Sequence, residues 1–177
     1  MKKGLLATLL VACGLTLQAF GAAPVPADAF GTGSYQTIGS CICGGQDQVK
    51  TGTVKFSFNF NVNNSGPCGP ATGEITLADS GCKVRLKGVI TKLESYVVSA
   101  TGNQGAQGEG VAVVYGVVTS GKLKGEFFRL ELSGGELASS SSFAFRIVSD
   151  LCVDDCPGYK TGAILLPPGT ISLSVFP

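Results

Sequence analysis

The sequence predicts an all-β domain, built as an antiparallel two-sheet sandwich or jelly roll, with a closed β-barrel as the alternative. Apolar and polar residues alternate strictly in several short runs, most clearly in TVKFSFNFNV at residues 53–62,. Each run ends in turn-forming residues, such as the NNSGPCGP that follows this one,. No segment of helical length beyond the N-terminal leader shows a 3.6-residue period, so we expect strands joined by turns.

Strict alternation places one set of side chains in the core and the other in water, because successive strand residues point to opposite faces. In residues 53–62 the apolar set includes Phe56, Phe58 and Phe60. The same alternation recurs around Val84, in FFRLEL, in FAFRI and in the final ISLSV. The expected strands are residues 33–39, 53–62, 72–78, 82–90, 92–99, 110–118, 123–132, 142–149 and 170–176.

The run VAVVYGVV at residues 111–118 departs from this alternation, because it is apolar on both faces. One explanation is a central strand whose second face is covered by a loop or by the N-terminal segment. The other is a contact with a second copy, which would make the protein a homo-oligomer through strand 111–118.

The N-terminus has the layout of a secretory signal peptide, with two lysines before an apolar run that ends in small residues,. We expect residues 1–21 to form this leader, with cleavage after Gly21 or after Ala23. The sequence LVACG around Cys13 also fits a lipoprotein cleavage site, so the alternative to a secreted protein is one anchored by a lipid on this cysteine,.

The remaining chain suits a single β-domain over residues 32–177, preceded by an N-terminal tether at residues 22–31,. Without the two leader lysines it holds 11 basic and 12 acidic residues, a net charge of −1. This balance does not attract nucleic acid or an anionic membrane surface. We therefore expect no nucleic-acid partner. The leader is also too short for a membrane-spanning helix, so we expect no membrane insertion.

The cysteine count indicates disulfides. Of the seven cysteines, Cys13 is either removed with the leader or lipidated, and the even number that remains is typical of exported, cross-linked domains,. We expect Cys68 to pair with Cys82, because this bond would close a short loop next to the Phe-rich strand. The other four cysteines predict two further cross-links, from Cys41 and Cys43 to Cys152 and Cys156.

Those last four cysteines could instead form a tetrahedral thiolate site for zinc. An oxidising compartment and the C-x-C and C-x₃-C spacings favour disulfides over zinc,. A thioredoxin-type redox motif is not expected, because the chain contains no C-x-x-C,.

The absence of histidine limits the chemistry further. It excludes Ser-His-Asp and Cys-His nucleophiles and histidine-ligated metals, so we expect no catalytic residue, no cofactor and no enzyme activity,. Asp150, Asp154 and Asp155 could offer oxygen ligands to calcium, but they lack the spacing of a known calcium loop, and a solvated acidic turn is favoured. Tyr159, beside this turn, is the aromatic candidate for contact with a ligand. A Ser-Lys pair or two carboxylates are the remaining routes to a hydrolase, and the carboxylate candidates are Glu74, Glu109, Glu126 and Glu136,.

Six segments between residues 50 and 176 form a series: KFSFNFNV, ATGEITLAD, KVRLKGVITKLES, GVVTSGKLKGEFFRLEL, FAFRI and GTISLSV. Taken in order, they resemble the small secreted β-domains called post-COAP, found at the ends of bacterial surface and exported proteins. This resemblance implies a β-fold without established catalytic residues. The cysteines of the present chain depart from that family's pattern.

The sequence therefore favours a secreted, disulfide-linked, non-catalytic domain with a structural or adhesive role at the cell surface or in the extracellular matrix. Its partner there is not identified by any motif. The alternative is an extracellular binding module, for carbohydrate or dependent on calcium, that would use the loop from Asp150 to Tyr159.

Overall fold

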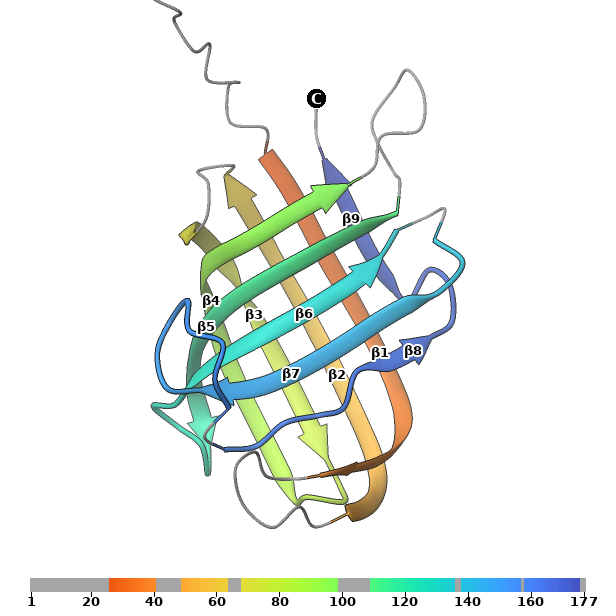
Figure 1. The fold of residues 1–177 in the computed structure, drawn as a ribbon, viewed down its shortest axis with the longest axis vertical. Helices are drawn as coiled ribbons and strands as arrows, with labels where there is room; N and C mark the ends of the chain where they lie inside the picture. The colour runs from red at the N-terminus through yellow and green to blue at the C-terminus, as the bar shows by residue number, and fades with distance from the viewer. Residues whose placement is uncertain are drawn as a thin grey trace, which may run out of the picture.

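The protein is all-β in a computed structural model that describes residues 26–40, 49–63, 68–98, 109–135, 138–156 and 158–175 (Figure 1). The predicted leader and the cysteines at positions 41 and 43 lie outside these residues. The part of the chain described has no helix long and apolar enough to cross a membrane. The strands are β1 (Pro26–Ser40), β2 (Val49–Asn63), β3 (Gly69–Asp79), β4 (Val84–Val98), β5 (Gly110–Gly121), β6 (Phe127–Gly134), β7 (Ser141–Val148), β8 (Ile164–Leu166) and β9 (Ile171–Val175).

All nine strands belong to one antiparallel sheet with the order β8-β7-β6-β5-β4-β3-β2-β1-β9. From β1 to β8, each strand pairs with the next one in sequence, and β9 returns to pair with β1. The sheet curls into a half-barrel, so that β5 to β8 form a front layer over β3, β2, β1 and β9 behind (Figure 1). The predicted all-β class is confirmed, but the strands form one curled sheet, and the two separate sheets of a sandwich are not confirmed.

Strand β4 turns the corner between the two layers. The sequence predicts two strands here, at 82–90 and 92–99, whereas the structure has one strand of 15 residues. Its pairing with β5 shifts register between Ile90 and Lys92 and again between Leu93 and Ser95. Such bulges bend a strand and increase its twist, which lets the first half of β4 pair with β3 behind while its second half runs in front,.

Aromatic side chains fill the space between the two layers. The alternating residues of β2 point inward as predicted, and Phe56, Phe58 and Phe60 are each at most 5% exposed. Phe56 stacks against Phe143 of β7, with ring centroids 4.1 Å apart, which joins the rear layer to the front one. Burying one such ring contributes about 2–3 kcal/mol, so the aromatic core is a main source of stability.

Two glycines on neighbouring strands make room for another core ring. Gly88 of β4 and Gly116 of β5 lie beneath Phe128, which is fully buried. A Cβ atom at Gly116 would collide with this ring and with the carbonyl oxygen of Val89. The strand pairing in this part of the sheet therefore depends on the missing side chain.

Two further differences from the predicted elements concern the ends of the chain. Strand β1 begins at Pro26, so residues 26–31 belong to the sheet, where a tether is predicted. Strand β8 was not predicted, because its three residues, Ile164–Leu166, are too few to show alternation.

The strand predicted to be apolar on both faces is β5, in the middle of the sheet. On its outer face Tyr115 is 1% exposed and Val113 is 8% exposed, so side chains from the neighbouring strands already cover them. Val111, nearer the strand end, remains 48% exposed. A covered central strand thus accounts for most of this segment. The cover comes from side chains of adjacent strands, where a loop or the N-terminal segment is predicted.

We predict that Gly116→Ala destabilises the protein by about 1–3 kcal/mol, because Phe128 and the β4 backbone must move to admit a methyl group. Gly162→Ala is the matched control, since a Cβ atom there meets nothing within 4 Å. Urea unfolding of both variants measures the difference. Equal stability of the two variants would contradict the proposed packing of Phe128.

Candidate functional site

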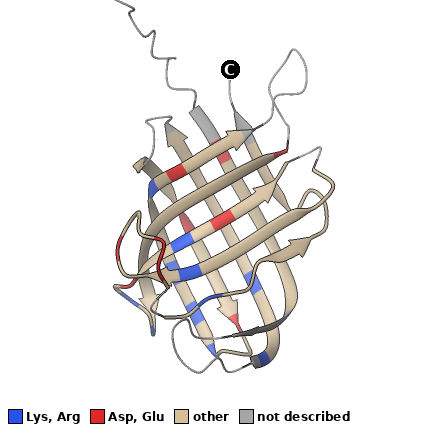
Figure 2. Ribbon diagram, viewed as in Figure 1, with Lys and Arg blue, Asp and Glu red and all other residues tan. Residues whose placement is uncertain are grey.

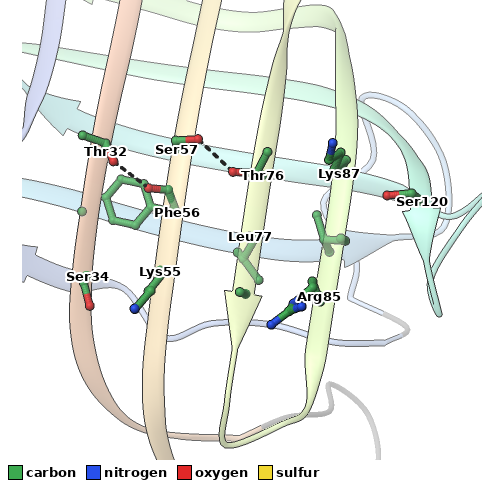
Figure 3. Close-up of a pocket in the computed structure, with 13 residues that line it drawn as sticks. Thr32, Ser34, Lys55, Phe56, Ser57, Thr76, Leu77, Arg85, Lys87 and Ser120 are labelled. Atoms are coloured by element: carbon green, nitrogen blue, oxygen red, sulfur yellow. Dashed lines mark hydrogen bonds between the residues drawn. The ribbon is translucent and has the colours of Figure 1, made fainter.

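An open groove of about 920 Å³ crosses the outer face of the rear layer (Figure 3). Its floor includes backbone of β2, β3 and β4 at Phe56, Leu77 and Leu86, whose side chains are buried in the core. Its walls come from the outward-facing residues of the same strands, with β1 on one side and the end of β5 on the other. The groove is therefore part of the sheet surface, outside the filled interior.

Strand register arranges the polar side chains of the groove in two rows. In the first row Lys55 lies opposite Ser34 on one side and Ala78 on the other, and Ala78 lies opposite Arg85. The second row contains four hydroxyl side chains and one lysine, and it runs in the order Thr32, Ser57, Thr76, Lys87 and Ser120.

Hydrogen bonds fix some of the hydroxyl groups in the second row. The Ser57 and Thr76 hydroxyl oxygens are 2.8 Å apart, and the Thr32 hydroxyl donates to the carbonyl oxygen of Phe56 at 3.3 Å (Figure 3). In the first row, the small side chain of Ala78 lies between the long side chains of Lys55 and Arg85, which leaves a hollow at Ala78. The groove therefore presents polar side chains, some of which are held in place by hydrogen bonds.

The groove is basic. Lys55, Arg85 and Lys87 are all exposed and make no ion pair with a described residue. Lys83 lines an adjoining hollow of about 500 Å³, which shares Lys55 and Arg85 with the groove. Blue segments lie on the lower halves of the rear strands (Figure 2). Near-neutral total charge thus coexists with a local positive surface.

Charged side chains on the outer face of the front layer are paired. Arg129 is 8% exposed; its Nε lies 3.2 Å from Glu94 Oε2, and its guanidinium also contacts Glu131. Arg146 contacts the same Glu131 carboxylate at 2.9 Å. Tyr115 donates a hydrogen bond of 2.6 Å to Glu94, and its ring lies under the Arg129 guanidinium.

The bulge in β4 explains why Glu94 reaches this cluster. Leu93 and Ser95 pair with consecutive residues of β5, which leaves Glu94 as the extra residue between them,. Burial would raise the pKa of Glu94, but hydrogen bonds from Tyr115 and Arg129 outweigh it and hold that pKa below its usual range. Burial and the Glu94 carboxylate raise the pKa of Tyr115 to about 12, so this phenol remains a neutral donor.

The loop after β7 is fastened to this cluster and to the rear layer. Asp154 contacts Arg146 and lies 3.6 Å from Arg129. Cys152 forms a disulfide with Cys68, which directly precedes β3. The loop that carries SDLCVDDC is thus one end of a covalent cross-link, in agreement with its predicted role.

The partner of this cross-link differs from the prediction. Cys68 pairs with Cys152, so the expected bond between Cys68 and Cys82 is wrong, as is a bond from Cys152 to Cys41 or Cys43. The physical reason is that the loop after β7 folds back to the start of β3, a contact that spacing in the sequence does not reveal. Cys82 and Cys156 are also disulfide-bonded.

The acidic turn does not gather its carboxylates around one point. Asp150 accepts a hydrogen bond from the Leu151 amide and Asp155 accepts one from the Ser149 amide, while Asp154 faces the arginines. The bond from Ser149 lowers the pKa of Asp155. Among the described residues, no three Asp, Glu, Cys or His side chains are grouped as metal ligands.

Tyr159 is not available to stack on a ligand, which corrects its predicted role. It is 4% exposed, and its hydroxyl donates a hydrogen bond of 2.9 Å to the buried Asp79 carboxylate. Burial, followed by the charge of Asp79, raises the pKa of Tyr159 strongly. Its ring lies next to that of Phe145, so Tyr159 is part of the hydrophobic core.

The carboxylates considered for a hydrolase lie on different elements. Glu74, Glu109 and Glu126 are exposed, on β3 and just before β5 and β6 respectively, and Glu136 lies outside the described residues.

The groove itself is not predicted from the sequence. Its residues are ordinary outward positions of alternating strands, and only the outward parity of Lys55, Arg85 and Lys87 could have indicated it.

Comparison with models of protein families, with curated proteins and with solved structures finds no match to this chain.

We predict that Arg129→Leu destabilises the protein by about 1–3 kcal/mol at neutral pH, because it leaves partly buried carboxylates without their partner. The lowered pKa of Glu94 means that its pairing stabilises the fold above its unfolded-state pKa, about 4.3,. This contribution is lost as the pH falls through the folded-state pKa.

Urea unfolding at several pH values should therefore show the native and Arg129→Leu proteins converging in acid. Arg85→Leu is the control, because Arg85 is exposed and makes no ion pair with a described residue, and it should change stability by less than about 0.5 kcal/mol,. A destabilisation by Arg129→Leu that is the same at every pH would argue against the ion pairs.

Proposed function

We propose that this protein is an exported, non-catalytic β-domain with a structural or adhesive role at the cell surface or in the extracellular matrix. The observation that carries the proposal is the open groove on the outer face of β1–β4, lined by cationic and hydroxyl side chains, on a sheet whose interior is filled. A filled, cross-linked sheet supports a rigid scaffold, and a groove open to solvent suits contact with a large partner.

The proposal of export rests on two observations. The first residues have the layout of a signal peptide, and a disulfide is consistent with an extracellular location,. Export could take two forms. The protein is either released after cleavage at Gly21 or Ala23, or anchored through a lipid on Cys13. The resemblance to post-COAP domains belongs to the same proposal, since those domains occur in exported bacterial proteins.

The adhesive role predicts that blocking the groove reduces binding to surface material. Ala78→Glu would fill the hollow and place a carboxylate between Lys55 and Arg85, where it would pair with both cations,. We expect adsorption of the purified protein to cell-envelope and matrix material of its source to fall about tenfold.

Ala163→Glu is the matched control, because Ala163 is an exposed alanine outside the groove. Thermal unfolding establishes that both variants are folded. Adsorption that is equally strong for the native protein and Ala78→Glu would reject the groove as the adhesive surface, and absence of adsorption by the native protein would reject the adhesive role.

Self-association through residues 111–118 is the second part of the proposal. Its support is a cross-strand pair of exposed valines, Val97 of β4 and Val111 of β5, which are 63% and 48% exposed. Two valines bury little area, so a contact between copies here would be weak.

We therefore predict that the native protein dimerises only at concentrations of about 0.1 mM and above. Val111→Lys should remove the dimer, because it would bring two like charges into the contact. Val153→Lys, at an exposed loop valine, should not. Sedimentation equilibrium over a concentration series tests this, and a native protein that stays monomeric at the highest concentration would contradict it.

A further inference from the structure

The positions of the groove cations follow from strand register. Lys55 and Arg85 share one row with Ala78 between them, so their strands are separated by two spacings, roughly 10 Å,. Lys87 lies two residues beyond Arg85 on the same face of β4, in the row of hydroxyl residues. The three cations therefore form a triangle around the hollow at Ala78.

No acidic side chain of the described residues neutralises this triangle. Asp79, at the end of β3, is buried and accepts hydrogen bonds from Tyr159 and from the Cys82 amide. Glu74 faces outward on β3, but it lies opposite Val89, one row beyond Lys87, and makes no ion pair with a described residue. By contrast, the arginines of the front layer share three carboxylates. The positive charge of the groove is thus available to a partner.

The chemistry of the lining indicates the partner. Hydroxyl groups of Thr32, Ser57, Thr76 and Ser120 lie in the row of Lys87 and beside the row of Lys55 and Arg85. Such a surface matches a ligand that carries both hydroxyl and anionic groups. The side chain of Phe56, the one aromatic residue in the lining, is buried, so the groove offers no ring on which nucleic-acid bases could stack,.

We propose that the groove binds an acidic polysaccharide, a linear polymer of sugars with carboxylate or sulfate groups. This inference rests on the proposed adhesive role and names its partner. Lys55, Arg85 and Lys87 bind the anionic groups, while the hydroxyl row forms hydrogen bonds with the sugar hydroxyls. Because the cations are exposed, the binding weakens as salt screens them.

The test measures binding of the full mature protein to three probes: polygalacturonate, dextran sulfate and uncharged dextran of similar length. We expect binding to one or both anionic polymers, no binding to dextran, and loss of affinity at high salt. Lys55→Gln, Arg85→Gln and Lys87→Gln should each weaken binding about two- to fivefold, and the triple variant at least about tenfold. Lys50→Gln is the matched control, because Lys50 is exposed and lines neither the groove nor the adjoining hollow. This variant should bind like the native protein.

Equal binding to dextran and to the anionic polymers would overturn the proposal, as would a triple variant with native affinity. Stronger binding to duplex DNA or to phosphatidylglycerol vesicles than to either anionic polymer would also overturn it. The adsorption assay with cell-envelope and matrix material distinguishes a failure of the polysaccharide assignment from a failure of the adhesive role. If the triple variant adsorbs as well as the native protein, the polysaccharide assignment fails while the adhesive role stands; if the native protein does not adsorb, the adhesive role itself fails.

Discussion

The burial of one aromatic face of the sheet against itself is the constraint on which the rest of this structure depends. The rings of β2 require cover, and Phe56 finds it by stacking on Phe143 five strands away in the sheet order. This contact requires the sheet to curl, and the bulges of β4 together with Gly88 and Gly116 make the curvature sterically possible,. Outside the bulges, the outward side chains of the described strands are then placed by the parity of their strand.

The two outer faces that result have different electrostatic roles. On the front layer the arginines are paired with carboxylates, and one of these, Asp154, belongs to a loop that is also held by the disulfide of Cys152. Those charges stabilise the position of the loop. On the rear layer Lys55, Arg85 and Lys87 make no ion pair with a described residue, and a cation without such a pair keeps its attraction for an external anion. The contrast between neighbouring faces of one sheet is why we assign binding to the rear one.

Much of the fold could be predicted from alternation, because a period of two identifies both a strand and its buried face. The sequence therefore predicts the Phe-rich β2 closely, whereas β8 is too short to show a pattern. For β4 the sequence predicts two strands, because the bulges interrupt the alternation. Strand order was not predictable, since parity says nothing about which strands are neighbours. For the same reason Lys55 and Arg85 could be recognised as outward but not as members of one site. The choice of Cys152 as the partner of Cys68, and the burial of Tyr159, likewise depend on the path of one loop in space.

The position of the disulfide also determines how the domain would respond to mechanical load. Cys68 and Cys152 are 84 residues apart, and the chain between them contains β3 to β7. A pulling force applied at the two ends of the chain would pass through the disulfide, so these five strands lie outside the path of the load. The Cys68–Cys152 bond leaves only the chain outside residues 68–152 to be extended by that force, and the further disulfides of Cys82 and Cys156 can only shorten this length. A protein that holds a cell or matrix component against flow would thereby keep its central strands, including the β3 and β4 positions of the groove, folded while its ends are under tension.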